Sequence, residues 1–334
     1  MRTKIFVSVI LSLLFLLTGC SIFNVSGPKD KIKVYTTLDR DFVGVLCEKY
    51  GETLVTGKKT VFEITDKEED IASADCIIGG VNFLRQKASQ DALQKLNTEY
   101  ADLLPVELKD REDQWVGIFY DPAVFLINQS YSRKEGQQHI LHWVDIPKLD
   151  HPQIVMENLT DNDSTLMFLA SMSSRMGQNE FMEYFKQIRP FIKQFARFPI
   201  TPVRMAATGD ADIAITRRSH VFKYMQNDFP AYILIPSEGT PVNLYGAAIL
   251  KNSRRVKECT AFIDWILNSS EARNVLLTTR SGYLPLLPQG EQGHAVRLDT
   301  LWINTFYTDE RMMEKLAEDW VREIRLSDRK EEAN

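Results

Sequence analysis

Residues 31–50 have the sequence KIKVYTTLDRDFVGVLCEKY, in which an extended run is followed at once by an amphipathic one. Ile32–Thr37 predicts a β-strand. Apolar residues at Phe42, Val43, Val45 and Leu46 recur with helical spacing, so they predict a helix over residues 39–50. The chain therefore opens with a strand and a helix.

Strand and helix signals continue to alternate beyond residue 50. Val61–Ile64 predicts a second strand, and Cys76–Ile78 predicts a third that ends at Gly79 and Gly80 before another helix. This order is typical of βαβ units on a mostly parallel sheet. We therefore expect an α/β fold.

Two strand-like runs, Trp115–Tyr120 and Ala123–Asn128, follow each other closely and are broken at Asp121 and Pro122. No helix separates them, and extended pairs of this kind carry a chain from one lobe to another. We predict an interlobe hinge here. A second α/β set follows, with a helix predicted over residues 180–195 and a helical, amphipathic end over residues 298–326.

The first 20 residues have the pattern of an exported leader. Arg2 and Lys4 precede an apolar run over residues 5–17, which is shorter than the roughly 20 residues that span a bilayer. Leu17-Thr18-Gly19-Cys20 resembles the lipobox of bacterial lipoproteins, in which the cysteine becomes a lipidated N-terminus. A buried structural cysteine is the alternative. The lipobox interpretation predicts an extracytoplasmic protein anchored to the lipid bilayer through Cys20, at the cell surface or in the periplasm.

Composition limits the function classes. Without residues 1–19, which hold two of the 40 Lys and Arg residues, 315 residues remain with 38 basic and 45 acidic side chains, a formal net charge of −7. That length favours two lobes. An acidic body without a long basic block argues against nucleic-acid binding. Cys47, Cys76 and Cys259 lie in apolar patterns, so we expect buried free thiols, with oxidation of one pair as the alternative.

Several segments together resemble a type II periplasmic solute-binding protein, of the ferric-iron, phosphonate and polyamine branch that serves ABC importers. The segments that carry the resemblance lie in the same order as in that family: Val34–Asp39, Trp115–Gly117 with Val124–Asn128, Trp143–Ile146 with Ile154–Met156, Val203–Ala214, Glu238–Pro241 through Gly246–Ala248, Ala261–Leu267 and Tyr283–Pro285.

The resemblance implies two lobes that close on a solute by hinge motion. The expected organisation is a signal peptide over 1–19, a lipidated tether over 20–30, a first lobe over 31–130 and 236–285, a second lobe over 131–235 and 286–327 with C-terminal helices, and a charged tail over 328–334. It also implies a monomeric binding protein with an ABC permease as partner. A solute sensor that presents its closed form to a membrane kinase remains the alternative.

Ligands of two-lobe α/β proteins bind at the carboxyl ends of strands and the starts of the following helices. That rule selects eight candidate ligand-binding residues: Thr36, Thr37, Gly79, Gly80, Ser164, Thr165, Arg217 and Arg218. The two glycines permit close approach of a ligand to the backbone, the hydroxyls at a helix start favour an anion, and the arginines suit a carboxylate or phosphate.

Iron binding and catalysis are less favoured. Ferric-binding relatives have adjacent tyrosines just after the cleft strand, where this chain has Arg217-Arg218-Ser219-His220 and no tyrosine before Tyr224. An anionic organic solute, such as a phosphonate, a phosphate ester or a chelated metal, is therefore favoured over direct ferric iron, although Asp161 and Asp163 lie beside Ser164. No nucleophile elbow, P-loop or zinc-protease motif is present, so we expect no enzyme, no cofactor and no metal site.

Overall fold

The structure, a computed structural model, describes residues 31–53, 60–133, 140–225, 229–286, 297–304, 306–307 and 309–327. The predicted leader, tether, Cys20 and charged tail lie outside these ranges. The chain from Ile32 onward forms one compact unit by its contacts. No helix in the described ranges combines the length and the apolarity needed to cross a membrane.

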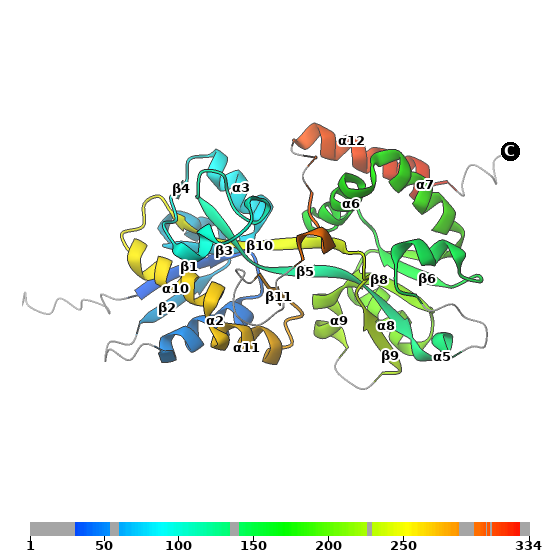
Figure 1. The fold of residues 1–334 in the computed structure, drawn as a ribbon, viewed down its shortest axis with the longest axis horizontal. Helices are drawn as coiled ribbons and strands as arrows, with labels where there is room; N and C mark the ends of the chain where they lie inside the picture. Colours follow the sequence, from blue (N-terminus) through cyan, green and yellow to red (C-terminus); the bar gives the residue numbers. More distant parts are fainter. Residues whose placement is uncertain are drawn as a thin grey trace, which may run out of the picture. The chain divides into compact units, whose positions relative to one another are not determined.

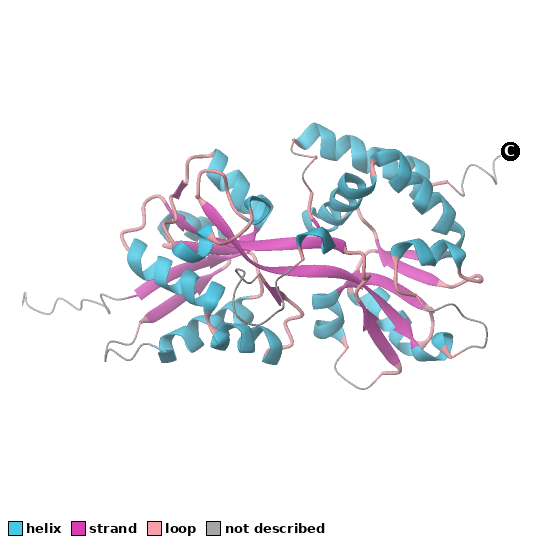
Figure 2. Cartoon of the chain, viewed as in Figure 1, coloured by secondary structure: helices cyan, strands magenta, loops and turns pink. Residues whose placement is uncertain are grey.

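Helices pack on both faces of one mixed sheet, whose strand order is β2-β1-β3-β10-β5-β8-β6-β7 (Figures 1 and 2). We call the part of the chain around its first hydrophobic core, which contains Val34 and Ile77, the first lobe. Its elements are β1 (Lys31–Thr36), α2 (Arg40–Thr53), β2 (Val61–Thr65), β3 (Cys76–Gly80), α3 (Val81–Ser89), β4 (Leu93–Gln94), α4 (Glu99–Asp102), α10 (Val256–Asn268), α11 (Ser270–Thr278) and β11 (Leu284–Pro285).

We call the part around Phe125 and Trp143 the second lobe. Its elements are α5 (Gln129–Ser132), β6 (Ile154–Glu157), α6 (Asp163–Met176), α7 (Gln178–Ile188), β7 (Ile192–Ala196), α8 (Ile200–Thr208), β8 (Ile213–Arg217), α9 (Arg218–Tyr224), β9 (Ala231–Leu234), β12 (Leu301–Trp302) and α12 (Glu310–Trp320). Figure 1 shows α6, α7 and α12 on one side of this part of the sheet and α8 and α9 on the other.

Two long strands, β5 (Trp115–Asn128) and β10 (Thr240–Leu250), run through both lobes. They pair antiparallel, from Val242 opposite Pro122 to Ala248 opposite Trp115. Side chains alternate along β5, so Phe125 packs into one core of the second lobe and Val124 into another on the opposite face of the sheet. We call β5 and β10 the hinge strands. Their side chains are part of the hydrophobic cores of the lobes through which they run.

The structure corrects three details of the sequence-based elements. β5 is continuous through Asp121 and Pro122, where a break was expected. The predicted helix over residues 180–195 ends at Ile188, and Ile192–Ala196 forms β7 beside β6. The predicted C-terminal helical segment starts with one 3₁₀ turn (Leu298–Thr300) and the short strand β12, and its long helix begins only at Glu310. Cys47, Cys76 and Cys259 are buried free thiols, as predicted.

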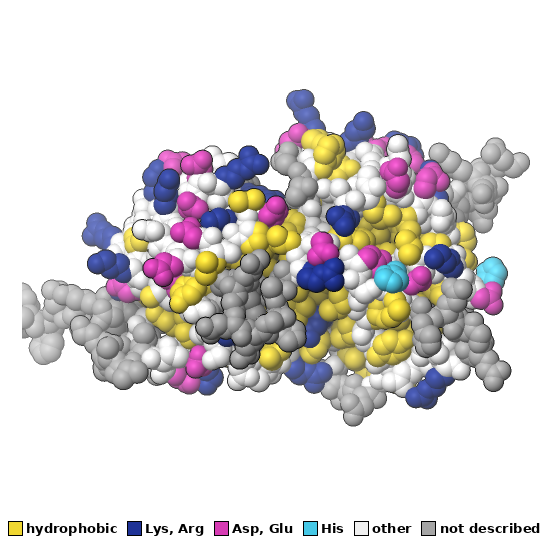
Figure 3. All heavy atoms as spheres, in the orientation of Figure 1, with side chains coloured by type: hydrophobic (Ala, Val, Ile, Leu, Met, Phe, Trp, Pro, Cys, Tyr) yellow, Lys and Arg dark blue, Asp and Glu magenta, His cyan; other side chains and the backbone are white. Residues whose placement is uncertain are grey.

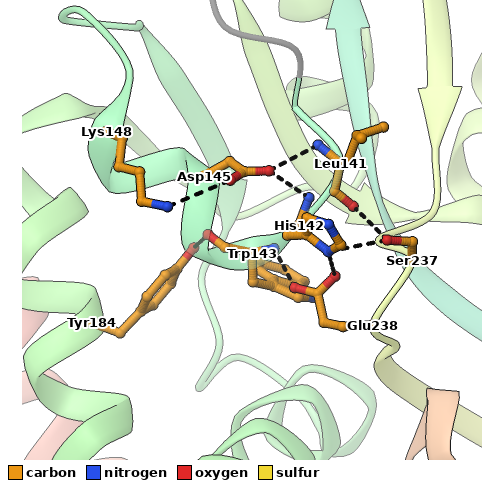
Figure 4. Close-up of polar contacts among 8 residues, drawn as sticks. All are labelled: Leu141, His142, Trp143, Asp145, Lys148, Tyr184, Ser237 and Glu238. Atoms are coloured by element: carbon orange, nitrogen blue, oxygen red, sulfur yellow. Dashed lines mark hydrogen bonds and ion pairs between the residues drawn. The ribbon is translucent and has the colours of Figure 1, made fainter.

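The turn that leads into β10 is hydrogen-bonded to the second lobe (Figure 4). The carboxylate of Glu238 accepts the backbone N–H of Trp143 at 2.6 Å and lies 2.8 Å from Nδ1 of His142. The hydroxyl of Tyr184 donates to the carbonyl of Trp143 at 3.0 Å. Because Trp143 is buried in the core, β10 starts from a fixed point of the second lobe.

Candidate functional site

A cavity of about 990 Å³ lies between the two lobes. The first lobe lines it with the segment after β1, the start of α2 and the start of α3. The second lobe contributes the start of α6 and residues of α9, and the middle of β10 crosses between them. On the face shown in Figure 3, basic and acidic side chains of the described residues are interspersed over both lobes.

Four of the eight candidate residues line this cavity: Thr37, Gly80, Ser164 and Arg217. Thr37 directly follows β1, Gly80 and Arg217 end β3 and β8, and Ser164 lies in the first turn of α6. Elements distant in sequence therefore bring them to one place. Cys20 lies outside the described residues.

The other four candidates lie beside the cavity, outside its described lining: Thr36, Gly79, Thr165 and Arg218. The buried Thr36 hydroxyl accepts the N–H of Leu38 at 3.0 Å. A side chain at Gly79 would meet Oγ1 of Thr37 at 2.7 Å, so glycine is needed for packing. Thr165 shares a capping box with Asn162, and Arg218 donates to the carbonyl of Gly282 at 2.7 Å.

Arg217 provides the buried positive charge of the cavity. It ends β8, is only 5% exposed, and donates from both terminal nitrogens to Ser164, at the hydroxyl and at the backbone carbonyl. The amide of Asn243 donates to the same hydroxyl at 2.7 Å. In the described part of the chain, no ion pair to a carboxylate accompanies these bonds. A guanidinium has five N–H donors, so two bonds leave donors for a ligand.

A carboxylate–imidazole pair lies next to Arg217. The buried carboxylate of Glu157, at the end of β6, is 2.7 Å from Nδ1 of the cavity residue His220, and Thr216 donates to it at 3.3 Å. Burial raises the pKa of Glu157, but the hydrogen bond from His220 and the positive charge of Arg217 outweigh burial and lower it overall. An ionised Glu157 makes Nδ1 of His220 a donor and leaves Nε2 for other partners.

Asp121 on β5 joins the hinge to the second lobe. Its carboxylate accepts the backbone N–H of Ser219 at 3.0 Å and the hydroxyl of Ser219 at 2.5 Å. Burial raises the pKa of Asp121, against the opposing effect of Arg217. The start of α9 is therefore held against the middle of the hinge strand.

An aromatic wall faces these polar groups. The ring of Tyr283 lies 5.1 Å from Phe42, 5.5 Å from Phe119 and 5.2 Å from Tyr245, between centroids. Burial raises the pKa of both Tyr245 and Tyr283, so their phenols are neutral at neutral pH. The cavity thus has an aromatic side and an end that contains the guanidinium of Arg217, which we call the cationic end although the carboxylates of Asp121 and Asp163 also line the cavity.

Six of these cavity residues were absent from the sequence-based candidates: Phe42, Asp121, His220, Asn243, Tyr245 and Tyr283. Asn243 and Tyr245 alternate with apolar residues on β10, and that alternation was the available signal. Tyr283 follows Gly282 in a loop, where no alternation of polar and apolar residues could indicate it. Among the described residues, no group of three or more His, Cys, Asp and Glu side chains is arranged to hold a metal ion.

Comparisons with known proteins agree with this architecture. A family model described as bacterial extracellular solute-binding protein matches residues 72–292. The probable ABC transporter periplasmic-binding protein y4fP of Sinorhizobium fredii is 22% identical over 269 residues, covering 78% of this chain and 74% of that protein.

Solved structures have the same fold. The periplasmic binding protein AfuA of Actinobacillus pleuropneumoniae, with exogenous fructose-6-phosphate bound, matches with a TM-score of 0.62 and 20% identity, covering 90% of this chain and 100% of that one. Iron-bound HitA of Pseudomonas aeruginosa matches with a TM-score of 0.66 and 17% identity, covering 86% of this chain and 98% of that one. The fold is thus the two-lobe α/β architecture of periplasmic binding proteins, as predicted.

Proposed function

Because the chain belongs to the family of bacterial extracellular solute-binding proteins, we propose that it captures a small anionic organic solute between its lobes and delivers it to an ABC importer. The family resemblance inferred from the sequence is confirmed. The family and the structural neighbours are binding proteins of ABC transporters rather than enzymes.

The observation that carries the choice of an anion is the buried guanidinium of Arg217. A charge removed from water is stable when a counter-charge or well-placed hydrogen bonds replace its hydration. Ser164 supplies two such bonds, and the cavity side stays open for an acidic group of the solute. Thr37, Gly80 and His220 complete the proposed polar contacts.

The aromatic wall supports an organic solute over a bare ion. The rings of Tyr245 and Tyr283 lie next to the polar end and suit the ring or carbon chain of a solute. Among the described residues, no group of three or more His, Cys, Asp and Glu side chains accompanies these two phenols, which favours an organic solute over direct ferric-iron binding. A phosphate ester, as in the fructose-6-phosphate complex of AfuA, fits both features.

We also propose that the protein is anchored outside the cytoplasmic membrane through lipid on Cys20. The leader pattern before Cys20 supports this anchor, and membership of an extracellular family agrees with export. A tether over residues 20–30 would keep a monomeric receptor beside its permease. We propose the lobe boundaries expected from the sequence, except that residues 123–130 belong to the second lobe, since Phe125 packs into its core.

The test is a binding screen of the purified chain by thermal shift and calorimetry, with fructose 6-phosphate, a phosphonate, inorganic phosphate, spermidine and ferric citrate. An anionic organic probe should raise the melting temperature, because a ligand specific for the folded state stabilises it. Arg217→Met should weaken that binding about tenfold or more, since a hydrogen bond to a charged group contributes about 1.5–3 kcal/mol.

Arg204→Met is the matched control, because Arg204 lies exposed on α8. Its affinity should equal that of the unmodified protein. Failure of every anionic probe to bind, or equal affinity in Arg217→Met, would exclude the proposed anion site.

A further inference from the structure

Two arginines join the lobes through reciprocal hydrogen bonds to backbone carbonyls. Arg218 of α9, in the second lobe, donates to the carbonyl of Gly282 at 2.7 Å. Arg280, from the segment after α11 of the first lobe, donates to the carbonyl of Met225 at 3.0 Å. The guanidinium of Arg218 also lies 4.4 Å from the centre of the Phe222 ring, which holds it in place. We call residues 280–283 together with Arg218 the interlobe clasp.

The backbones of the clasp are in direct contact. Gly282 has a φ of +78°, which disfavours any side chain. A Cβ at Gly282 would lie 2.7 Å from the nitrogen of Ser219 and 2.9 Å from the carbonyl carbon of Arg218, and closer still to Cα of Ser219. Glycine is therefore required both by conformation and by the approach of α9.

The clasp is connected on both sides to the walls of the cavity. Tyr283, directly after Gly282, forms part of the aromatic wall, and Arg217 and His220 flank the clasp in the second lobe. Ser219, which packs on Gly282, is also bonded to Asp121 on the hinge strand. A shift of α9 relative to residues 280–283 would therefore change the position of Arg217 relative to Tyr283.

We propose that Arg218 and Gly282 are positioning residues, which hold the two lobes in the arrangement that sets the cationic end of the cavity opposite its aromatic wall. The effect on affinity rests on the proposed function; the effect on lobe arrangement does not. Arg218, selected from the sequence as a ligand contact, would then influence the solute only through the lobes. Losing the clasp lowers the fraction of molecules with an assembled cavity, which weakens apparent affinity.

The lobe arrangement can be measured without a solute. Spin labels on unnatural ketone side chains at Gln86 of α3 and Gln187 of α7, both exposed, report the interlobe distance by double electron–electron resonance and spare the native thiols. Arg218→Ala and Gly282→Ala should each broaden or shift the distance distribution of the unliganded full chain. Arg218→Lys, which still donates a hydrogen bond, should restore most of the original distribution.

Gly209→Ala is the matched control for Gly282→Ala. Gly209 also has a positive φ, of +84°, but the nearest atom to its Cβ would be Nδ2 of Asn128 at 3.6 Å. The Gly209→Ala substitution imposes the same type of backbone strain away from the clasp, so it should leave the interlobe distance distribution unchanged. Distributions of Arg218→Ala and Gly282→Ala equal to that of the unmodified chain would overturn the proposal.

Affinity provides the second measurement, with fructose 6-phosphate and inorganic phosphate as probes. Arg218→Ala should weaken whichever probe binds by about fivefold, the lower end of typical coupling between sites. Weaker binding with an unchanged interlobe distance would place Arg218 on the solute itself and overturn the proposal. If neither probe binds the unmodified protein, the proposed function fails for these anions. The distance measurement still tests whether the clasp holds the two lobes in their arrangement.

Discussion

Replacing Glu157 by glutamine tests whether the carboxylate–imidazole pair of Glu157 and His220 stabilises the second lobe. The carboxylate is buried and lies 2.7 Å from Nδ1 of His220 and 3.3 Å from the hydroxyl of Thr216. Glutamine keeps the size of the side chain but removes its charge. The bond from His220 therefore loses its ionic acceptor, and the nearby guanidinium of Arg217 loses part of its compensating charge.

The expected loss follows from the type of bond. Hydrogen bonds to charged groups contribute about 1.5–3 kcal/mol, so we expect Glu157→Gln to lower the free energy of unfolding by about 2 kcal/mol at pH 7. For a urea dependence of about 3 kcal/mol per molar, the midpoint should fall by about 0.7 M. Trp143, Trp302 and Trp320 lie in the core of the second lobe, so tryptophan fluorescence follows its unfolding.

The pH dependence has a definite sign. Because the folded protein lowers the pKa of Glu157, the stabilisation is complete above the ordinary glutamate pKa of about 4.3 and is lost as the pH falls through the lower folded value. The difference between the two proteins should thus be full at pH 7 and shrink below about pH 4. Glu183→Gln is the control, since Glu183 is 64% exposed and pairs with Lys186 on the surface. A Glu157→Gln midpoint equal to that control at pH 7 would refute the reasoning.

Two further predictions concern the turn before β10 and the N-terminus. Glu238→Ala should lower the free energy of unfolding by about 1–3 kcal/mol, because it leaves the backbone N–H of Trp143 without its acceptor; a thermal unfolding midpoint equal to that of the unmodified protein would contradict this. Cys20→Ala should move the protein from the membrane to the soluble fraction of cells with unchanged solute affinity, and a variant that stays with the membrane would contradict the lipid anchor.

The alternation of strands and helices in the first lobe was predictable because each element has its own local pattern. β7 was missed for a physical reason: in Ile192–Ala196, Lys193 and Gln194 are exposed, so the strand has few apolar residues to distinguish it from the preceding helix. Its pairing with β6 is a tertiary interaction that sequence periodicity does not encode.

The break expected at Asp121 and Pro122 illustrates the same limit. Both residues are typical of turns, yet β5 continues through them. Asp121 is held by Ser219 of α9, and Pro122 lies opposite Val242 of β10. Partners more than 90 residues away thus keep extended two residues that locally favour a turn, which places a carboxylate at the centre of the hinge.

The cavity was partly predictable for a topological reason. In a two-lobe α/β protein the carboxyl ends of the strands of both lobes point into the space between the lobes, so the sequence alone selects Thr37, Gly80 and Arg217. Asn243 and Tyr245 lie within a strand and Tyr283 in a loop, so that rule does not select them. Asn243 and Tyr245 reach the cavity because β10 crosses from one lobe to the other, and the ring of Tyr283 packs against that of Tyr245.

Arg217 and Arg218 are adjacent in the sequence, but their side chains have different surroundings in the structure. Arg217 is the last residue of β8 and Arg218 the first of α9, so the change from extended to helical backbone occurs between them. Their side chains consequently leave the chain in different directions, one to Ser164 in the cavity and the other to Gly282 in the clasp. If Arg217 binds the solute and Arg218 holds the lobes, as we propose, both effects act on adjacent residues of a single strand–helix junction. This junction would then link occupancy of the cavity to the orientation of the lobes.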